Sequence, residues 1–273
     1  ALSVWAAYMP AGAGLAMALS PLLLPTLGWR GLWVVTAAML LLAAALAWAQ
    51  RQRYAPASAS THAPPAGGSA GAALTILRQP LPWLLALAFG VWAIQHFALI
   101  VWLPTFLKEQ RGLSAGWVAV LTGVMLLACV PGNLLGGVLL QRGVARGPML
   151  AVAHTLTGLC GLGFFFDGFG DGLRYGLCVA LSFIGGVIPA AVMSSSTVLA
   201  RNPRQTSAMQ GLLMQGSQLG QGVGTPLIAA VVAASGSWGS ARWVTAGAAV
   251  LGIALGLAAW AVERRLVQRG LVA

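Results

Sequence analysis

Eight long apolar stretches constrain this chain more than any other feature of its sequence. A helix crosses roughly 30 Å of hydrocarbon with about 20 apolar residues. The stretches exceed the about ten residues of a barrel strand and show no strict alternation, so helices are expected. They cover residues 2–24, 29–49, 82–105, 115–140, 149–167, 174–199, 206–234 and 241–262. The sequence therefore predicts an all-α membrane protein with eight transmembrane helices.

Composition supports this interpretation and excludes several classes of protein. Of the 273 residues, 59% are hydrophobic and only 7% are charged, whereas a soluble domain carries about a quarter charged residues. An aqueous enzyme, a disordered chain and a disulfide scaffold are therefore poor fits. Cys129, Cys160 and Cys178 lie inside apolar runs without metal-ligand spacing. Because the sequence also lacks motifs for phosphate binding, zinc binding or nucleophilic catalysis, it predicts a non-enzyme with no cofactor and no metal.

The basic residues indicate how the chain is oriented. A net charge of +11 would suggest a nucleic-acid partner for a soluble protein, but here the basic residues stand singly between apolar runs. We therefore expect the lipid bilayer, and no nucleic acid, as a partner. If the loops alternate between two sides, ten basic residues fall on the side of residues 51–80 and five on the other. Lys and Arg are enriched on the cytoplasmic side of membrane proteins, so residues 51–80 and the C-terminus are predicted to be cytoplasmic. The membrane that the chain crosses is predicted to be a bacterial inner membrane.

The two ends of the chain resemble each other. Ser20-Pro21-Leu22 matches Thr225-Pro226-Leu227. Two further pairs keep nearly the same offset: Trp33 to Ala37 with Trp243 to Ala246, and Ala47 to Arg51 with Ala259 to Arg264. Such similarity among apolar helices also arises by chance. If the match is real, the repeating unit is six helices in parallel orientation, which is typical of transporters.

This repeat predicts the organisation of the chain. Residues 1–50 would be the last two helices of an N-terminal bundle, and 81–273 a complete C-terminal bundle of six helices. Residues 51–80, rich in Ala, Pro, Gly and Ser, would be a flexible linker between them. Four helices of the first bundle are then expected upstream of Ala1.

Two motifs resemble the major facilitator superfamily of secondary transporters. Leu27-Gly28-Trp29-Arg30 resembles the Gly-Trp-Arg that often opens the sixth helix of that family. The loop after residue 136 resembles its G-x-L-x-D-R-x-G-R-[RK] motif: Gly137, Leu139, Arg142 and Arg146 fit, Gln141 replaces the acidic residue, and Gly143 is shifted by one. Strings at 102–104, 112–114 and 131–133 are similar to the cyanate permease branch. The resemblance implies alternating access between two bundles, with a gating loop at Gly137, Arg142 and Arg146.

Polar residues at membrane depth are costly, so they are candidates for function. Trp92, Gln95 and His96 stand at i, i+3 and i+4 and share one helix face. Trp92 can stack, Gln95 supplies donors and an acceptor, and His96 can change protonation. By the resemblance, their helix lines the central cavity, so the trio is expected to bind solute. The alternative is that His96 is a structural residue.

The stretch 206–234 carries the most polar residues. Ser207, Gln210, Ser217, Gln218 and Gln221 fall within a stripe of about 100° on a helix. They either join helices to each other or line a cavity, and we predict a lining role for at least one of Gln210 and Gln218. A separate stripe of Gly216, Gly220 and Gly224 predicts a close approach by another helix.

Further candidates are scattered along the chain. Asn133 either caps a kink at Pro131 or joins the site, and Ser194 either bonds to the preceding turn or joins the site. Tyr8 and Pro10 are candidates for the cavity wall. His154 is expected to reach toward lipid headgroups.

Together these features predict a secondary transporter for a small solute. If the branch resemblance holds, that solute is a small anion such as cyanate or a small heterocycle. Protons are the expected coupling ion, with His96 as the titratable candidate within the membrane. The expected partners are the bilayer, the solute, protons and the upstream helices. The alternatives are a multidrug exporter of the same fold and a non-transporting membrane sensor or scaffold.

Overall fold

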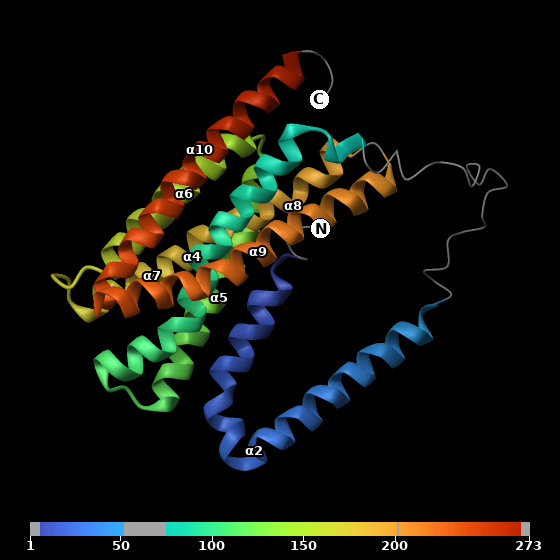
Figure 1. The fold of residues 1–273 in the computed structure, drawn as a ribbon. Coiled ribbons are helices and arrows are strands. Elements are labelled where there is room, and N and C mark those ends of the chain that lie inside the picture. Colours follow the sequence, from blue (N-terminus) through green and yellow to red (C-terminus); the bar gives the residue numbers. More distant parts are fainter. Residues whose placement is uncertain (1–5, 52–74, 201, 269–273) are drawn as a thin grey trace.

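The computed structural model describes residues 6–51, 75–200 and 202–268, and every regular element in that part is helical (Figure 1). The predicted linker at 51–80 lies mostly outside the described residues. The helices are α2 (Tyr8–Ala49), α4 (Pro80–Arg111), α5 (Ala115–Gln141), α6 (Arg146–Phe164), α7 (Asp171–Gly185), α8 (Val187–Leu199), α9 (Pro203–Ser235) and α10 (Ala241–Gln268), with the short 3-10 helix η2 (Trp238–Ser240) before α10. The predicted all-helical class is confirmed.

Local sequence sets several helix ends. Pro80 opens α4 at a position where a helix needs no backbone N–H, and Gly112 ends it in the left-handed conformation with φ 62°. The Asn202 side chain caps α9 by accepting a hydrogen bond from the Gln205 backbone N–H, and Gly236 ends that helix with φ 66°.

Helices α4 to α10 form one bundle. The largest contacts join α4 to α9 and α6 to α10, while α10 also packs on α4 (Figure 1). Helix α5 packs on both α7 and α8. The seam between α4 and α9 is built from glycine: a Cβ on Gly216 would meet the Ala86 carbonyl, and one on Gly220 would meet the Gly90 carbonyl. The two backbones therefore touch directly, as the glycine stripe leads one to expect.

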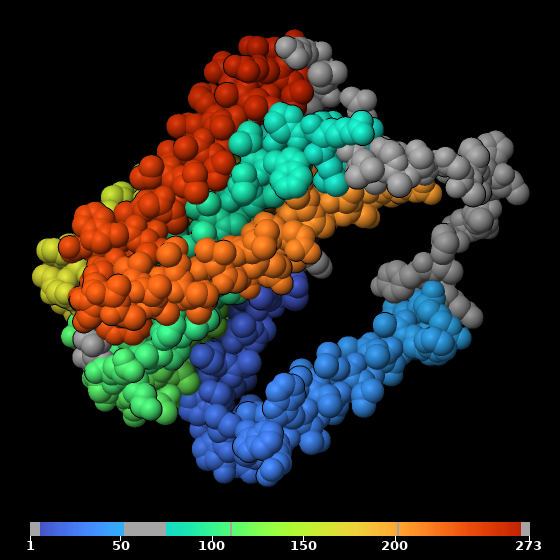
Figure 2. All heavy atoms as spheres, viewed as in Figure 1, coloured from blue at the N-terminus to red at the C-terminus, as the bar shows by residue number. Residues whose placement is uncertain are grey.

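Helix α2 consists of two arms joined at an elbow. Gly28 has φ 63° and ψ 173°, which a residue with a Cβ rarely adopts. The first arm lies along α5, where a Cβ on Gly123 would come within 2.9 Å of the Ala18 Cβ. The second arm stands away from the bundle (Figure 2), and its Trp33, Leu41 and Trp48 are 70%, 72% and 70% exposed.

Six segments of the described chain are long and apolar enough to cross a membrane, against the eight expected. They are Tyr8–Ala49, Pro80–Glu109, Ala115–Gln141, Arg146–Phe164, Asp171–Leu199 and Trp238–Gln268. The count differs for two reasons. The helix Tyr8–Ala49 joins the first two expected stretches across Gly28. Helix α9 is absent from the six because its glutamines and glycines lower its hydropathy.

The segment Asp171–Leu199 is interrupted in its middle. Helix α7 ends at Gly185 and α8 begins at Val187, with the Gly186 N–H donating to the Ser182 carbonyl at 3.0 Å. Helix α5 passes this break closely, since a Cβ on Gly132 would meet the Phe183 carbonyl. The break thus lies beside Asn133, one of the candidate residues.

Candidate functional site

A cavity of about 290 Å³ lies where α2, α4, α5, α8 and α9 meet. Its described lining contains no Asp, Glu, Lys or Arg side chain. The lining residues are Ala6, Tyr8, Met9, Pro10, Ala13, Phe89, Trp92, His96, Phe97, Ile100, Leu126, Cys129, Asn133, Pro189, Met193, Met214, Ser217, Gln218 and Gln221. Most of these side chains are apolar, so the cavity suits a small solute with few charges.

Helix α4 supplies an aromatic wall. The rings of Phe89 and Trp92 stack with centroids 5.5 Å apart, and those of Trp92 and His96 stack at 4.8 Å. Phe97 meets both Trp92 and His96 edge-on. The spacing i, i+3, i+7 and i+8 from Phe89 places these rings on one side of the helix. The wall therefore presents a continuous aromatic surface to the cavity.

Helix α9 supplies three polar side chains to the lining, those of Ser217, Gln218 and Gln221. The Gln221 Nε2 donates to the Gln218 Oε1 at 2.6 Å and to the Ser217 Oγ at 3.3 Å. Gln210 is engaged elsewhere, because its Nε2 donates to the Ser196 Oγ at 2.6 Å. Gln218 therefore lines the cavity, whereas Gln210 joins α9 to α8.

Gln95 is separated from its two expected companions. Its Nε2 donates to the Thr245 backbone carbonyl at 2.7 Å, and its Oε1 accepts from the Thr157 Oγ1 at 3.2 Å. The side chain is 0% exposed and is not among the cavity-lining residues. A buried amide needs partners for both of its ends, and α6 and α10 supply them here. Gln95 thus faces the interior of the bundle while Trp92 and His96 face the cavity.

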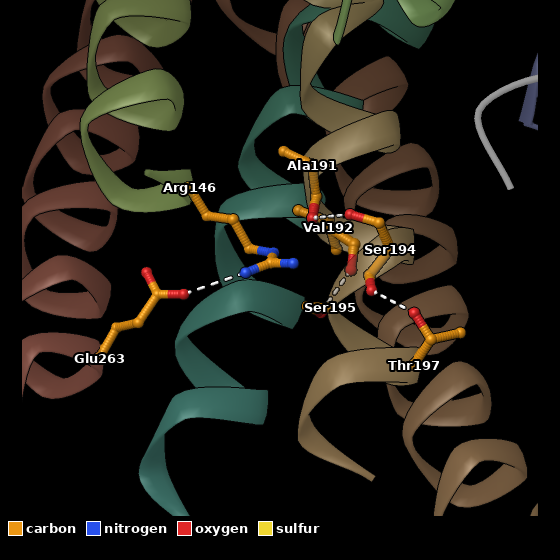
Figure 3. Close-up of polar contacts among 7 residues, drawn as sticks. All are labelled: Arg146, Ala191, Val192, Ser194, Ser195, Thr197 and Glu263. Atoms are coloured by element: carbon orange, nitrogen blue, oxygen red, sulfur yellow. Dashed lines mark hydrogen bonds and ion pairs between the residues drawn. The ribbon is translucent and has the colours of Figure 1, made fainter. Parts of the chain in front are cut away.

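The weaker candidates are also distributed between these two environments. Asn133 lines the cavity, and its Nδ2 donates to the Cys129 carbonyl at 3.2 Å. Ser194 lies outside the lining and donates to the Ala191 carbonyl at 3.0 Å, within its own helix (Figure 3). The expectation that His154 reaches lipid headgroups is wrong. Its ring is 0% exposed and lies against Gly252, where a Cβ would overlap it.

Several lining residues were not singled out from the sequence. They are apolar, as Phe89, Met193 and Met214 illustrate. The one available signal was helix periodicity: Phe89 precedes Trp92 by three residues, and Met214 precedes Gln218 by four. Apolar residues on a membrane helix carry no other mark of function.

Comparison with known proteins places this architecture in a family. A sequence profile described as the Major Facilitator Superfamily matches residues 1–209. The chain belongs to the major facilitator superfamily. The superfamily's bacterial homologue of the human lysosomal transporter Spinster has a solved structure that superposes with a TM-score of 0.62 at 17% identity, covering 88% of this chain and 60% of that one. This likeness supports the same helical fold.

Curated relatives from this superfamily are transporters. The 2-nitroimidazole transporter of Escherichia coli is 28% identical over 229 residues, which are 80% of this chain and 53% of that protein. The probable galactarate/D-glucarate transporter of Pseudomonas putida is 26% identical over 164 residues, or 57% of this chain and 35% of the relative. The chain thus spans about half the length of the Escherichia coli relative and about a third of the length of the Pseudomonas putida relative. It is a multi-pass membrane protein of this superfamily.

The loop that resembles the superfamily motif lies at one end of the bundle. Arg146 Nη1 pairs with Glu263 Oε1 at 3.1 Å, which links the start of α6 to α10 (Figure 3). Gly137 is buried within α5, and Arg142 is exposed just after that helix ends. Gly143 has φ 82°, so the tight turn between the two arginines requires a glycine.

A second hollow, of about 310 Å³, lies at the opposite end of the bundle. It contains Arg111 and Arg174, but a carboxylate already neutralises each of them. Arg111 Nη2 lies 2.8 Å from Asp171 Oδ1, and Arg174 Nη1 lies 3.2 Å from Asp167 Oδ1. The first pair joins the end of α4 to the start of α7, and the second ties α7 to the turn before it, so this hollow suits a structural role.

Proposed function

We propose that the protein is a secondary active transporter that moves one small solute across the membrane by alternating access. The observation that carries this proposal is the cavity of about 290 Å³ inside a chain of the major facilitator superfamily. Its volume is at the lower end for small-molecule sites, which fits a solute of one ring or smaller. Trp92, His96, Asn133 and Gln218 are the proposed contacts with the solute.

The proposal includes an arrangement of the whole transporter. We assign residues 1–50 to the last two of six helices in an N-terminal bundle and 81–273 to the C-terminal bundle, with eight membrane crossings in all. Residues 51–80 and the C-terminus would lie in the cytoplasm of a bacterial cell, beneath its inner membrane. Gly137, Arg142 and Arg146 would form a gating loop on that same side.

The solute we propose is a small anion such as cyanate or a small heterocycle, driven by a proton gradient. The name of the Escherichia coli relative, a 2-nitroimidazole transporter, supports the heterocycle. His96 is the ionisable histidine of the described cavity lining, so it is the candidate for proton coupling.

A multidrug exporter of the same fold is the second candidate. The methionines Met9, Met193 and Met214 favour it, because flexible thioether side chains adapt to different apolar ligands. Gradient-driven uptake of cyanate or 2-nitroimidazole would favour the first candidate, whereas efflux of the lipophilic cation ethidium would favour the second.

Labelling of the cavity from both sides of the membrane tests alternating access without knowledge of the solute. The protein would carry Met214→Cys, with Cys129, Cys160 and Cys178 replaced by alanine, in right-side-out and inside-out vesicles. We expect a membrane-impermeant maleimide to label Cys at 214 in both preparations, because Met214 lines the cavity. Labelling from one side alone would contradict transport and favour a sensor or scaffold.

A further inference from the structure

Two glutamines on α9, Gln218 and Gln221, are hydrogen-bonded to each other. The Gln221 Nε2 donates to the Gln218 Oε1 at 2.6 Å and to the Ser217 Oγ at 3.3 Å. These bonds use the acceptor of Gln218 and the donor of Gln221. The Gln218 Nε2 and the Gln221 Oε1 are then left without a described partner, although both residues line the cavity. A donor and an acceptor therefore stand three residues apart on one helix face.

The rest of the described lining favours one class of ligand for this amide pair. It contains no charged side chain, so it offers a small anion no countercharge. The aromatic wall of Phe89, Trp92 and His96 offers a flat apolar surface in the same cavity. A flat, uncharged ring can bury its faces against such a wall at little cost.

We propose that Gln218 and Gln221 are specificity-determining residues for a planar, uncharged heterocycle that carries an N–H beside a hydrogen-bond acceptor. The ring N–H donates to the Gln221 Oε1, and the neighbouring acceptor takes a hydrogen bond from the Gln218 Nε2. The ring itself lies against the aromatic wall of α4. This inference rests on the proposed transport function and specifies its solute class.

A matched pair of solutes tests the proposed recognition. 2-Nitroimidazole carries a ring N–H next to a nitro group, whereas 1-methyl-2-nitroimidazole keeps the ring and the nitro group and lacks the donor. Uptake of both, and of cyanate, would be measured in proteoliposomes under a proton gradient, at a mildly acidic pH that keeps the ring N–H protonated. We expect the wild-type protein to transport 2-nitroimidazole at least about tenfold more efficiently than the methylated compound, since the methyl group leaves Gln221 without its donor.

Substitutions then connect this preference to the amide pair. Gln218→Leu with Gln221→Leu is expected to bring the two efficiencies within about twofold of each other. Gln215→Leu is the matched control, because Gln215 lies on the same helix, is exposed and is outside the lining. It should keep the wild-type preference.

The possible results distinguish the inference about the solute from the proposed transport function. Equal transport of both nitroimidazoles by the wild-type protein overturns the inference, even if the double variant fails to fold. Retention of the preference in the double variant also overturns it. Gradient-driven uptake of cyanate alone overturns the inference and leaves the proposed transport function intact, whereas maleimide labelling from one side alone overturns that function itself.

Discussion

Helix α4 presents neighbouring residues to two different environments. His96 joins the aromatic wall of the cavity, with its ring 4.8 Å from that of Trp92. Gln95 faces into the bundle instead, bonded to the Thr245 carbonyl and the Thr157 hydroxyl. Both side chains are almost fully buried, so burial alone does not distinguish them. The difference lies in their partners: those of Gln95 are protein groups that hold the bundle, whereas His96 borders space that a solute can fill.

The largest expected effect comes from the contact that fixes α4 in place. Gly220→Leu would drive a side chain into the Gly90 carbonyl, and the two helices cannot separate without losing their seam. We expect no folded protein in the membrane, measured by size-exclusion chromatography of a fluorescent fusion. Gly222→Leu is the control, because a Cβ there meets nothing within 4 Å. Normal folding of the Gly220 variant would show that the seam tolerates separation.

A smaller effect is expected on the bundle-facing side of α4. Gln95→Leu leaves the Thr245 carbonyl and the Thr157 hydroxyl without this partner, so we expect a loss of about 1–3 kcal/mol in unfolding free energy. Thermal denaturation in detergent would measure it, with the exposed Gln215→Leu as the matched control. An unchanged melting temperature together with lost uptake would place Gln95 in the solute site after all.

The cavity-facing side of α4 should respond in the opposite way. His96→Ala removes one aromatic contact, which is worth about 0.5–1.5 kcal/mol. We therefore expect KM for solute exchange without a proton gradient to rise by about three- to tenfold, with little change in melting temperature, and we expect uptake driven by the gradient to be lost because His96 is the proposed coupling residue. Initial uptake rates over a range of concentrations would measure this. Wild-type uptake would remove His96 from the site and leave the fold unaffected.

The smallest expected effect separates the two bonds that Gln95 makes. Thr157→Val removes the hydroxyl that donates to the Gln95 Oε1 at 3.2 Å, and a neutral hydrogen bond contributes about 0.5–1.5 kcal/mol. Thr157→Ser keeps the hydroxyl and should retain more stability than the valine variant. If the two variants melt together, the Thr245 carbonyl carries the contribution of Gln95 by itself.

Much of the fold could be predicted from the sequence, because the length of an apolar stretch and the helix-breaking residues at its ends define a helix locally. The long apolar stretches predicted the all-helical class, and the Gly-Trp-Arg motif coincides with the Gly28 elbow of α2. Both motifs also predicted the superfamily, which the profile match to residues 1–209 confirms. The count of spans was less accessible, since α9 combines the length of a membrane helix with many polar residues.

The site was harder to predict from the sequence. Helix periodicity shows which residues share a face, but it does not show which neighbouring helix or cavity that face meets. At about 100° per residue, Gln95 and His96 are about 100° apart around α4, on either side of Trp92. That separation is enough to place one against the bundle and the other against the cavity. Gln210 and Gln218 share a stripe in the same way, but Gln210 meets Ser196 at the end of α8. Only the positions of neighbouring helices decide such cases, and His154 against Gly252 is another.

The glycine seam limits how α4 and α9 can move relative to each other. The aromatic wall belongs to one of these helices and the amide pair to the other, yet at the seam only main chain stands between them. Rotation of a side chain therefore cannot change the separation of the two helices at these glycines. Only a movement of one whole helix against the other would change it, and such a movement would also shift the aromatic wall relative to the amide pair.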